Sequence, residues 1–287
     1  MLQTVTNTIA AAAGTVQLGD LTVNRMGFGA MRLTGSGIWG EPDDRAMAKK
    51  VLHRLLDLGV NFIDTADSYG PNVSERLIAE TLYPYPEGLV IGTKGGLLRD
   101  GPGQWRPDGR PEHLRQALEG SLKRLKLERI DLYQFHRPDP EIPLEESLGA
   151  LVELQDAGKI RHIGLSNVDA QQLKQAREMA PIVSVQNRYN LSDRSSEEVL
   201  EMCQAAKLAF IPWFPLATGE LAGKDSPLAK AAARHNATPA QLALAWLLKR
   251  SPVMLVIPGT SSVKHLEENV KAAQIELDEA EFKALSG

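Results

Sequence analysis

Short apolar runs rich in β-branched and aromatic residues alternate along the chain with longer amphipathic stretches, and this alternation predicts the fold. We expect eight of the runs to form strands, at residues 25–30, 61–66, 89–96, 130–136, 160–167, 182–190, 209–216 and 254–260. The stretches between them carry apolar residues at three- and four-residue spacing, as in helices with one buried face. Examples are residues 44–59, 111–125, 143–158 and 195–207.

Local start and stop signals support these assignments. Residues 15–25 alternate in polarity around a Gly-Asp pair, which indicates a β-hairpin near the N-terminus. The first predicted helix ends at Gly59, a residue type that commonly follows a helix. Thr238 and Pro239 precede an apolar stretch as an N-cap and a first-turn proline would. Turn and capping residues therefore occur at the expected ends of these predicted elements.

Strict alternation of strands and helices predicts a parallel sheet with right-handed crossovers. Eight repeats favour closure into a (β/α)₈ TIM barrel, an α/β fold for which 287 residues is an ordinary length. We expect a loose leader over residues 1–14 and a single barrel domain with its N-terminal hairpin over residues 15–287. An open doubly wound sheet is the alternative, but the first strand lacks the complete Gly-rich phosphate turn of that fold.

Composition narrows the class of protein. The net charge of −4 and the lack of a basic stripe argue against a nucleic-acid partner. Cys203 is the only cysteine, which excludes an intramolecular disulfide and fits a reducing compartment. No apolar run approaches the roughly 20 residues that span a bilayer, and the first residues do not resemble an export signal. We expect a cytoplasmic protein with no membrane partner. Metal-binding spacings such as HExxH or CxxC do not occur, so we expect no metal site.

Polar residues gather where the predicted strands end. Asp64 ends the second strand, and Tyr69 lies in the loop that follows it. Lys94 ends the third strand, and His136 ends the fourth. Each residue alone has an ordinary structural explanation, in packing or in a salt bridge. However, the strands of a barrel all end at one rim, which is where the active sites of such barrels lie. Because four such residues fall at neighbouring strand ends, we expect them to act together in catalysis.

These four residue types suit the reduction of a carbonyl group. A phenol has a pKa near 10, too high for efficient proton transfer at neutral pH. We expect Lys94 to lower the pKa of Tyr69, and Asp64 to keep Lys94 charged and oriented. His136 beside the phenol can stabilise the developing oxyanion. The hydride must come from a cofactor, because no side chain donates one.

The chain resembles the aldo-keto reductase family from about Leu18 to Leu285. The motifs that carry the resemblance are GFGAM, NFIDTADSYG, GTKGG, DLYQFHRPDP, GKIRHIGLSN, VQNRYN and VIPGTSSVKHLEEN. The resemblance implies a catalytic tetrad, and the sequence departs from it at none of the four positions, which are Asp64, Tyr69, Lys94 and His136. It also implies the reduction of aldehydes or ketones to alcohols, with hydride from a nicotinamide cofactor and the proton from Tyr69.

The same resemblance implies where the nicotinamide end of the cofactor lies. Ser166, Asn167 and Gln186 match positions that hold the carboxamide, and their hydroxyl and amide groups suit that role. Trp213 matches the aromatic residue on which the ring stacks. The other implied contacts, to the pyrophosphate and the adenine, are at Gly29, Arg32, Leu216, Gly219, Glu268 and Asn269.

The site for a 2′-phosphate departs from that of NADP-specific members. Those members commonly have a lysine and an arginine where this chain has Gly259 and His265. Thr260 and Ser262, at the start of a predicted helix, can still donate hydrogen bonds to a phosphate, and Lys264 is close in sequence. We therefore favour NADP(H) as the cofactor and keep NAD(H) as an alternative.

The substrate is a small-molecule aldehyde or ketone on this interpretation. The C-terminal tail is too short to cover the pocket, so we expect the loops after the first and third strands to line it. The candidate residues are Met31, Trp39, Leu97 and Trp105. The short tail and the GTSSVKHLEEN motif resemble bacterial reductases that include pyridoxal reductases. General aldehyde reduction is the broader expectation.

Two other functions compete with this interpretation. A lyase could use Lys94 as a Schiff-base nucleophile, and it would trap substrate on Lys94 without needing a nicotinamide cofactor. Channel-associated β subunits share the fold and bind the cofactor as regulators. Such a subunit would be isolated together with a membrane protein, and it would not reduce simple carbonyl compounds.

Overall fold

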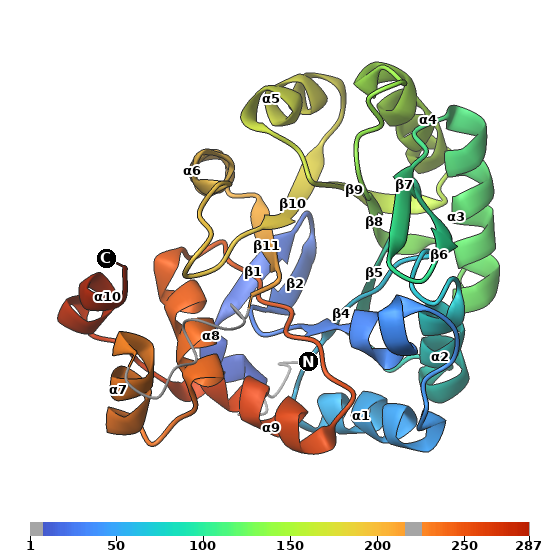
Figure 1. Cartoon of the computed structure of the whole chain (residues 1–287). Coiled ribbons are helices and arrows are strands. Elements are labelled where there is room, and N and C mark those ends of the chain that lie inside the picture. The colour runs from blue at the N-terminus through green and yellow to red at the C-terminus, as the bar shows by residue number, and fades with distance from the viewer. Residues whose placement is uncertain (1–7, 216–225, 287) are drawn as a thin grey trace, which may run out of the picture.

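The computed structural model describes residues 8–215 and 226–286, and a curved parallel sheet lies at its centre (Figure 1). Within these residues the sheet has seven strands in the order β11-β10-β9-β8-β5-β4-β3, and all neighbours are parallel. Seven of the eight expected strands are thereby confirmed. They are β3 (Phe28–Gly29), β4 (Phe62–Asp64), β5 (Val90–Gly95), β8 (Ile130–Phe135), β9 (Ile160–Ser166), β10 (Ile182–Arg188) and β11 (Ala209–Trp213).

The eighth expected strand, at residues 254–260, is not formed as a strand. Its backbone makes isolated bridges to both edges of the sheet instead. Leu255 N donates to Phe210 O at 2.9 Å, and Gly27 N donates to Val256 O at 2.8 Å. Pro258 has no N–H group to extend the pairing. The expectation of eight strands is therefore met only in part, since this segment contacts both edges through a few hydrogen bonds at isolated bridges.

Helices surround the sheet (Figure 1), and one apolar cluster fills the space between the two layers. No helix in the described part of the chain is long and apolar enough to cross a membrane. The helices are α1 (Arg45–Asp57), α2 (Val73–Leu82), α3 (Pro111–Leu125), α4 (Leu144–Asp156), α5 (Ala170–Met179), α6 (Glu197–Ala206), α7 (Pro227–Arg234), α8 (Pro239–Arg250), α9 (Val263–Lys271) and α10 (Glu279–Ser286).

The predicted cap of α8 is present. The Thr238 side chain accepts a hydrogen bond from Gln241 N, and the Gln241 side chain accepts one from Thr238 N. This reciprocal arrangement satisfies two donors at the start of the helix. Pro239 occupies the first turn, where its missing N–H group costs nothing.

The predicted N-terminal hairpin fills one end of the sheet. It consists of β1 (Thr15–Leu18) and β2 (Leu21–Asn24), which pair antiparallel. Leu18 and Val23 are fully buried and belong to a second apolar cluster with Phe62, Leu132 and Ile211 of the sheet. Because apolar side chains occupy this end, the polar strand ends lie at the opposite one.

Part of the expected leader is folded. Residues 10–13 form a 3₁₀ helix, Ala10 is fully buried, and Ala10 N donates to Leu58 O at 3.0 Å. The run of four alanines lacks the charge and the large side chains that usually mark an element. Its small side chains let the backbone approach the end of α1 closely, which is a tertiary effect.

The long loop after the third strand also contains structure that the sequence pattern did not predict. Residues 97–107 form an antiparallel hairpin of β6 (Leu97–Gly101) and β7 (Gln104–Pro107). Gly103, with a φ of 71°, occupies its turn. The hairpin places Trp105 and Leu97 at the polar end of the sheet.

Candidate active site

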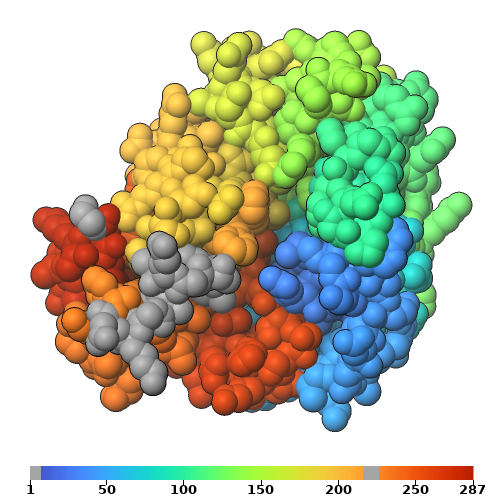
Figure 2. Space-filling model, viewed as in Figure 1, coloured from blue at the N-terminus to red at the C-terminus, as the bar shows by residue number. Residues whose placement is uncertain are grey.

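A cavity of about 440 Å³ lies at the end of the sheet where the strands finish. Asp64, Ser166 and Trp213 are the last residues of β4, β9 and β11. Figure 2 shows this face of the molecule, with a hollow near its centre. The lining residues are Gly29, Met31, Arg32, Asp64, Tyr69, Leu97, Trp105, His136, Arg137, Ser166, Asn167, Gln186, Trp213, Phe214, Pro215, Ile257, Pro258 and Gly259.

A buried ion pair forms the base of the cavity. Lys94 Nζ lies 2.7 Å from Asp64 Oδ2, and both side chains are almost completely buried. The second carboxylate oxygen, Oδ1, accepts hydrogen bonds from Gln134 Nε2 at 3.0 Å and from Gln186 Nε2 at 2.8 Å. A buried carboxylate with one cation and two amide donors is well satisfied. This explains how Asp64 can hold Lys94 in one position.

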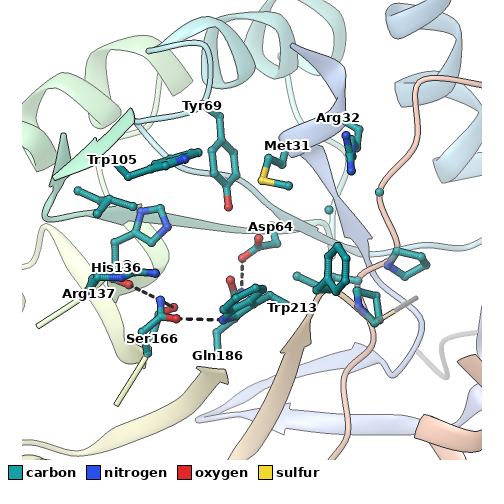
Figure 3. A pocket seen from close by; sticks show the side chains of 18 residues that line it. Met31, Arg32, Asp64, Tyr69, Trp105, His136, Arg137, Ser166, Gln186 and Trp213 are labelled. Carbon is teal, nitrogen blue, oxygen red and sulfur yellow. Dashed lines mark hydrogen bonds between the residues drawn. The ribbon is translucent and has the colours of Figure 1, made fainter. Parts of the chain in front are cut away.

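Lys94 contacts the tyrosine predicted to donate the proton. Its Nζ also donates to Thr65 O at 2.7 Å and lies 3.3 Å from the Tyr69 hydroxyl. Ser74 N donates to Tyr69 O at 3.2 Å, so the N-terminus of α2 fixes the backbone of this loop. Figure 3 shows the Tyr69 hydroxyl pointing into the cavity, towards Asp64.

Lys94 lowers the pKa of Tyr69, as expected, but burial has the larger effect. Burial raises the pKa of Tyr69 above its ordinary value, and the nearby Lys94 ammonium offsets this only in part. The phenol is therefore protonated at neutral pH, as a proton donor must be. Burial alone would lower the pKa of Lys94, but Asp64 and Tyr69 together raise it. Lys94 therefore remains a cation that stabilises the phenolate once the proton has left.

His136 stands beside Tyr69 as a neutral imidazole. Its ring lies edge-on to the Tyr69 ring, with 6.0 Å between centroids. Burial, together with the charges of Lys94 and Arg137, holds the pKa of His136 well below its usual range. A neutral imidazole can donate one N–H hydrogen bond to a carbonyl oxygen without protonating it.

The predicted nicotinamide contacts lie on one wall of the cavity and are connected to one another. Asn167 adopts a φ of 59°, and its Oδ1 accepts a hydrogen bond from Trp213 Nε1 at 3.1 Å. Its Nδ2 donates to His136 O and to Ser166 Oγ, both at 3.0 Å (Figure 3). Asn167 thus fixes the Trp213 ring, and Gln186 already donates to Asp64. Among the described residues, no group donates to Gln186 Oε1, which is therefore available to a ligand.

The structure brings most of the predicted residues together, but not all. Twelve of them line the cavity, and Lys94 lies directly behind Asp64 and Tyr69. Trp39 does not line it and is 37% exposed. Leu216 and Gly219 lie outside the described residues. The remaining predicted contacts lie in or just before α9 and do not line the described cavity; they are Thr260, Ser262, His265, Glu268 and Asn269.

Sequence reasoning missed several lining residues. Arg137 directly follows the predicted His136, so its position beside a strand end was a usable signal. The others are mostly apolar residues or prolines without a chemical signature, and they are Phe214, Pro215, Ile257 and Pro258.

Arg99 on β6 connects three segments around the cavity mouth. Its guanidinium donates to Ile38 O at 2.7 Å, to Ser68 O at 3.2 Å and to Gln104 O at 3.0 Å. Its Cζ atom lies 3.7 Å from the centre of a Trp105 ring, within the range of a cation–π contact. Arg99 therefore fixes Trp105 relative to the loop that carries Tyr69.

The chain matches known proteins over nearly its whole length. Residues 25–287 match the family model described as "Aldo/keto reductase family". The chain is 52% identical over 276 residues to an uncharacterized oxidoreductase of Schizosaccharomyces pombe, covering 96% of this chain and 90% of that protein. It is 44% identical over 283 residues to pyridoxine 4-dehydrogenase of Escherichia coli, covering 96% and 98%. The structure of an aldo/keto reductase from Klebsiella pneumoniae in complex with NADP and acetate aligns with a TM-score of 0.80 at 27% identity, over 94% of this chain and 93% of that one.

The parallel sheet, the strand-end cavity and these matches define an α/β oxidoreductase. The chain belongs to the aldo/keto reductase family. The expectation drawn from its motifs is confirmed at the level of the family.

Proposed function

We propose that this protein reduces aldehydes or ketones to alcohols with NADPH, and that Tyr69 donates the proton. The observation that carries the proposal is the position of the Tyr69 hydroxyl, which lines the cavity 3.3 Å from Lys94 Nζ. Bound NADPH supplies the hydride that attacks the carbonyl carbon.

The residues of the chain supply the rest of the chemistry. Tyr69 and the neutral His136 bind the carbonyl oxygen, and both donate hydrogen bonds as negative charge develops there. Tyr69 then transfers its proton to that oxygen. The resulting phenolate is stabilised by Lys94, whose position Asp64 maintains through the 2.7 Å contact. Leu97 and Trp105 form an apolar wall that excludes water from the reacting carbon.

The residues around the cavity fit a nicotinamide dinucleotide. The Trp213 indole is fixed by Asn167 and presents a flat face for the nicotinamide ring. Gly29 and Gly259 form a close backbone contact, since a Cβ atom at Gly259 would lie 2.6 Å from Gly29 O. A lysine therefore does not fit at residue 259 unless the backbone moves. We propose that Arg32 and the start of α9 bind the phosphates instead.

A carbonyl panel assayed with NADPH and NADH tests the proposal. Pyridoxal belongs in the panel because a relative with 44% identity is a pyridoxine 4-dehydrogenase. We expect aldehyde-dependent loss of nicotinamide absorbance, faster with NADPH. The absence of turnover with every carbonyl and both cofactors would contradict the proposal.

The Schiff-base alternative is not favoured by the position of Lys94. A nucleophilic lysine must be neutral and reach the substrate. Lys94 is fully buried behind Asp64 and Tyr69, and its pKa is raised. A purely regulatory role would leave the arrangement of Tyr69, Lys94 and His136 without a purpose.

His265→Arg is expected to strengthen NADPH binding about tenfold or more and to leave NADH binding unchanged, because only NADPH carries the 2′-phosphate. His265 is exposed in the first turn of α9, and its backbone N–H faces Ser262 Oγ. Isothermal titration of both cofactors against wild type and variant measures the effect. Equal gains for both cofactors would show that residue 265 does not face the 2′-position.

Arg99→Met is expected to raise KM for benzaldehyde by about three- to tenfold. The variant removes the guanidinium group that stacks on the Trp105 ring and holds it through hydrogen bonds to neighbouring carbonyl groups. Propanal, which is too small to need that wall, is the control substrate and should change less. Arg99→Lys keeps the charge but cannot reach three carbonyls at once. Identical losses for both aldehydes in steady-state kinetics would mean that Arg99 acts on the whole fold rather than on Trp105.

A further inference from the structure

Two arginines line opposite sides of the cavity. Arg32 lies on the side of Gly29 and Gly259, and Arg137 lies beside His136, on the side of Trp105 (Figure 3). Both side chains are exposed. Within residues 8–215 and 226–286, neither arginine has an ion pair or a side-chain hydrogen bond. A guanidinium group with five unused donors at a binding cavity is available for a ligand.

The cofactor accounts for only one of these cations. On the proposed function its phosphates would lie next to Arg32, on the side where the Gly29 and Gly259 backbones approach each other. Arg137 follows the residue that would bind the carbonyl oxygen, and in Figure 3 it lies across the cavity from Arg32. One dinucleotide therefore does not occupy both, because its reactive ring has to lie at Tyr69, between them.

The charge of the cavity supports a second anion. Asp64 is the only acidic residue among the described lining residues, and Lys94 already neutralises it. The remaining lining charges are the two arginines, although the whole chain has a net charge of −4. Trp105 lies on the same side of the cavity as Arg137, next to the neutral His136 (Figure 3). This combination fits a substrate with a carbon frame and one anionic group.

We infer that Arg137 is a specificity-determining residue that binds an oxyanion, such as a carboxylate, on the carbonyl substrate. The inference rests on the proposed carbonyl reduction and narrows its substrate class to anionic aldehydes and ketones. A planar guanidinium binds a carboxylate through two parallel hydrogen bonds. Such a contact holds the substrate with its carbonyl group next to His136 and Tyr69.

The test compares 4-carboxybenzaldehyde with its neutral methyl ester. The ester group withdraws electrons more strongly than the carboxylate, so intrinsic reactivity favours the ester. Each substrate is therefore compared between wild type and variant, where this difference cancels. We expect wild type to prefer the carboxylate. Arg137→Gln is expected to lower kcat/KM for the carboxylate about tenfold or more, mainly through KM, and to leave the ester unchanged. The 3-carboxy isomer is included because the ring can present the anion from either position.

Arg177→Gln is the matched control, since Arg177 is exposed on α5, away from the cavity, and its loss changes the net charge equally. It should keep the wild-type preference. An unchanged carboxylate-to-ester ratio in Arg137→Gln would overturn the inference.

If wild type reduces neither these aldehydes nor any other carbonyl of the panel, the proposed function fails, and calorimetry still tests the subsite. Binding of 4-(hydroxymethyl)benzoate to NADP⁺-loaded protein should weaken in Arg137→Gln relative to its methyl ester. Equal weakening of both alcohols would also overturn the inference.

Discussion

Tyr69→Phe is expected to lower kcat by about 10²–10⁴-fold, the usual contribution of a positioned proton donor. The change removes one hydroxyl group, and Lys94 keeps its contacts with Asp64 and Thr65 O. The cofactor wall, formed by Trp213 and Asn167, is not altered. We therefore expect the dissociation constant of NADPH to remain unchanged when turnover and binding are measured on the same preparation.

Tyr133→Phe provides the matched control. Tyr133 is a fully buried phenol on β8, and its hydroxyl has no hydrogen-bond partner among the described residues. Removing that hydroxyl should leave turnover intact. If Tyr69→Phe kept more than about a tenth of the wild-type kcat, another group would have to be the general acid.

Lys94→Met is expected to lower kcat by a comparable factor through a different cause. The Tyr69 pKa is already raised by burial, and Lys94 is the group that offsets this rise. Without the cation the phenolate is less stable, so the proton leaves Tyr69 less readily. The variant also leaves Asp64 buried without its partner, which typically costs about 3–5 kcal/mol of stability.

The double variant Asp64→Asn/Lys94→Met separates these two effects. It removes both charges of the buried pair, so it should recover much of the lost stability in thermal unfolding. It should not recover turnover, because Tyr69 still lacks the cation. Recovery of turnover together with stability would mean that Lys94 serves only the fold.

The pH dependence gives an independent check on Lys94. A proton donor acts while it is protonated, so reduction is fastest below the Tyr69 pKa and declines as the pH rises through it. Because Lys94 lowers this pKa, its loss should move the alkaline decline in kcat to higher pH. A residual activity with the decline at the wild-type pH would contradict this electrostatic role.

The sequence predicted the parts of the fold that local patterns determine. The start of α8 at Thr238 and Pro239 depends on residues within one turn, and the structure confirms it. The β6–β7 hairpin was not predicted, because Arg99 supports it through carbonyl groups at Ile38 and Ser68, far away in sequence. The run at residues 254–260 has the composition of a strand, but strand formation requires continuous pairing with neighbours.

In the candidate site, too, some features followed from the sequence and others depended on tertiary structure. Residue type and position at a strand end were enough to bring Asp64, Tyr69 and Lys94 together. The sequence indicated that Lys94 lowers the Tyr69 pKa, but it could not show that burial raises this pKa by more. Gln186 lines the cavity, but the hydrogen bond from its Nε2 to Asp64, 122 residues away in the chain, was not predicted.

Hydride transfer from nicotinamide to a carbonyl carbon is the central claim, and isotope labelling tests it most directly. Wild-type protein is incubated with an aldehyde and NADPH that carries deuterium on one face of C4, and then on the other. Mass spectrometry of the alcohol should find one deuterium on the former carbonyl carbon with one of the two labels, and Tyr69→Phe should form little product. An alcohol without deuterium from either labelled cofactor would contradict the account.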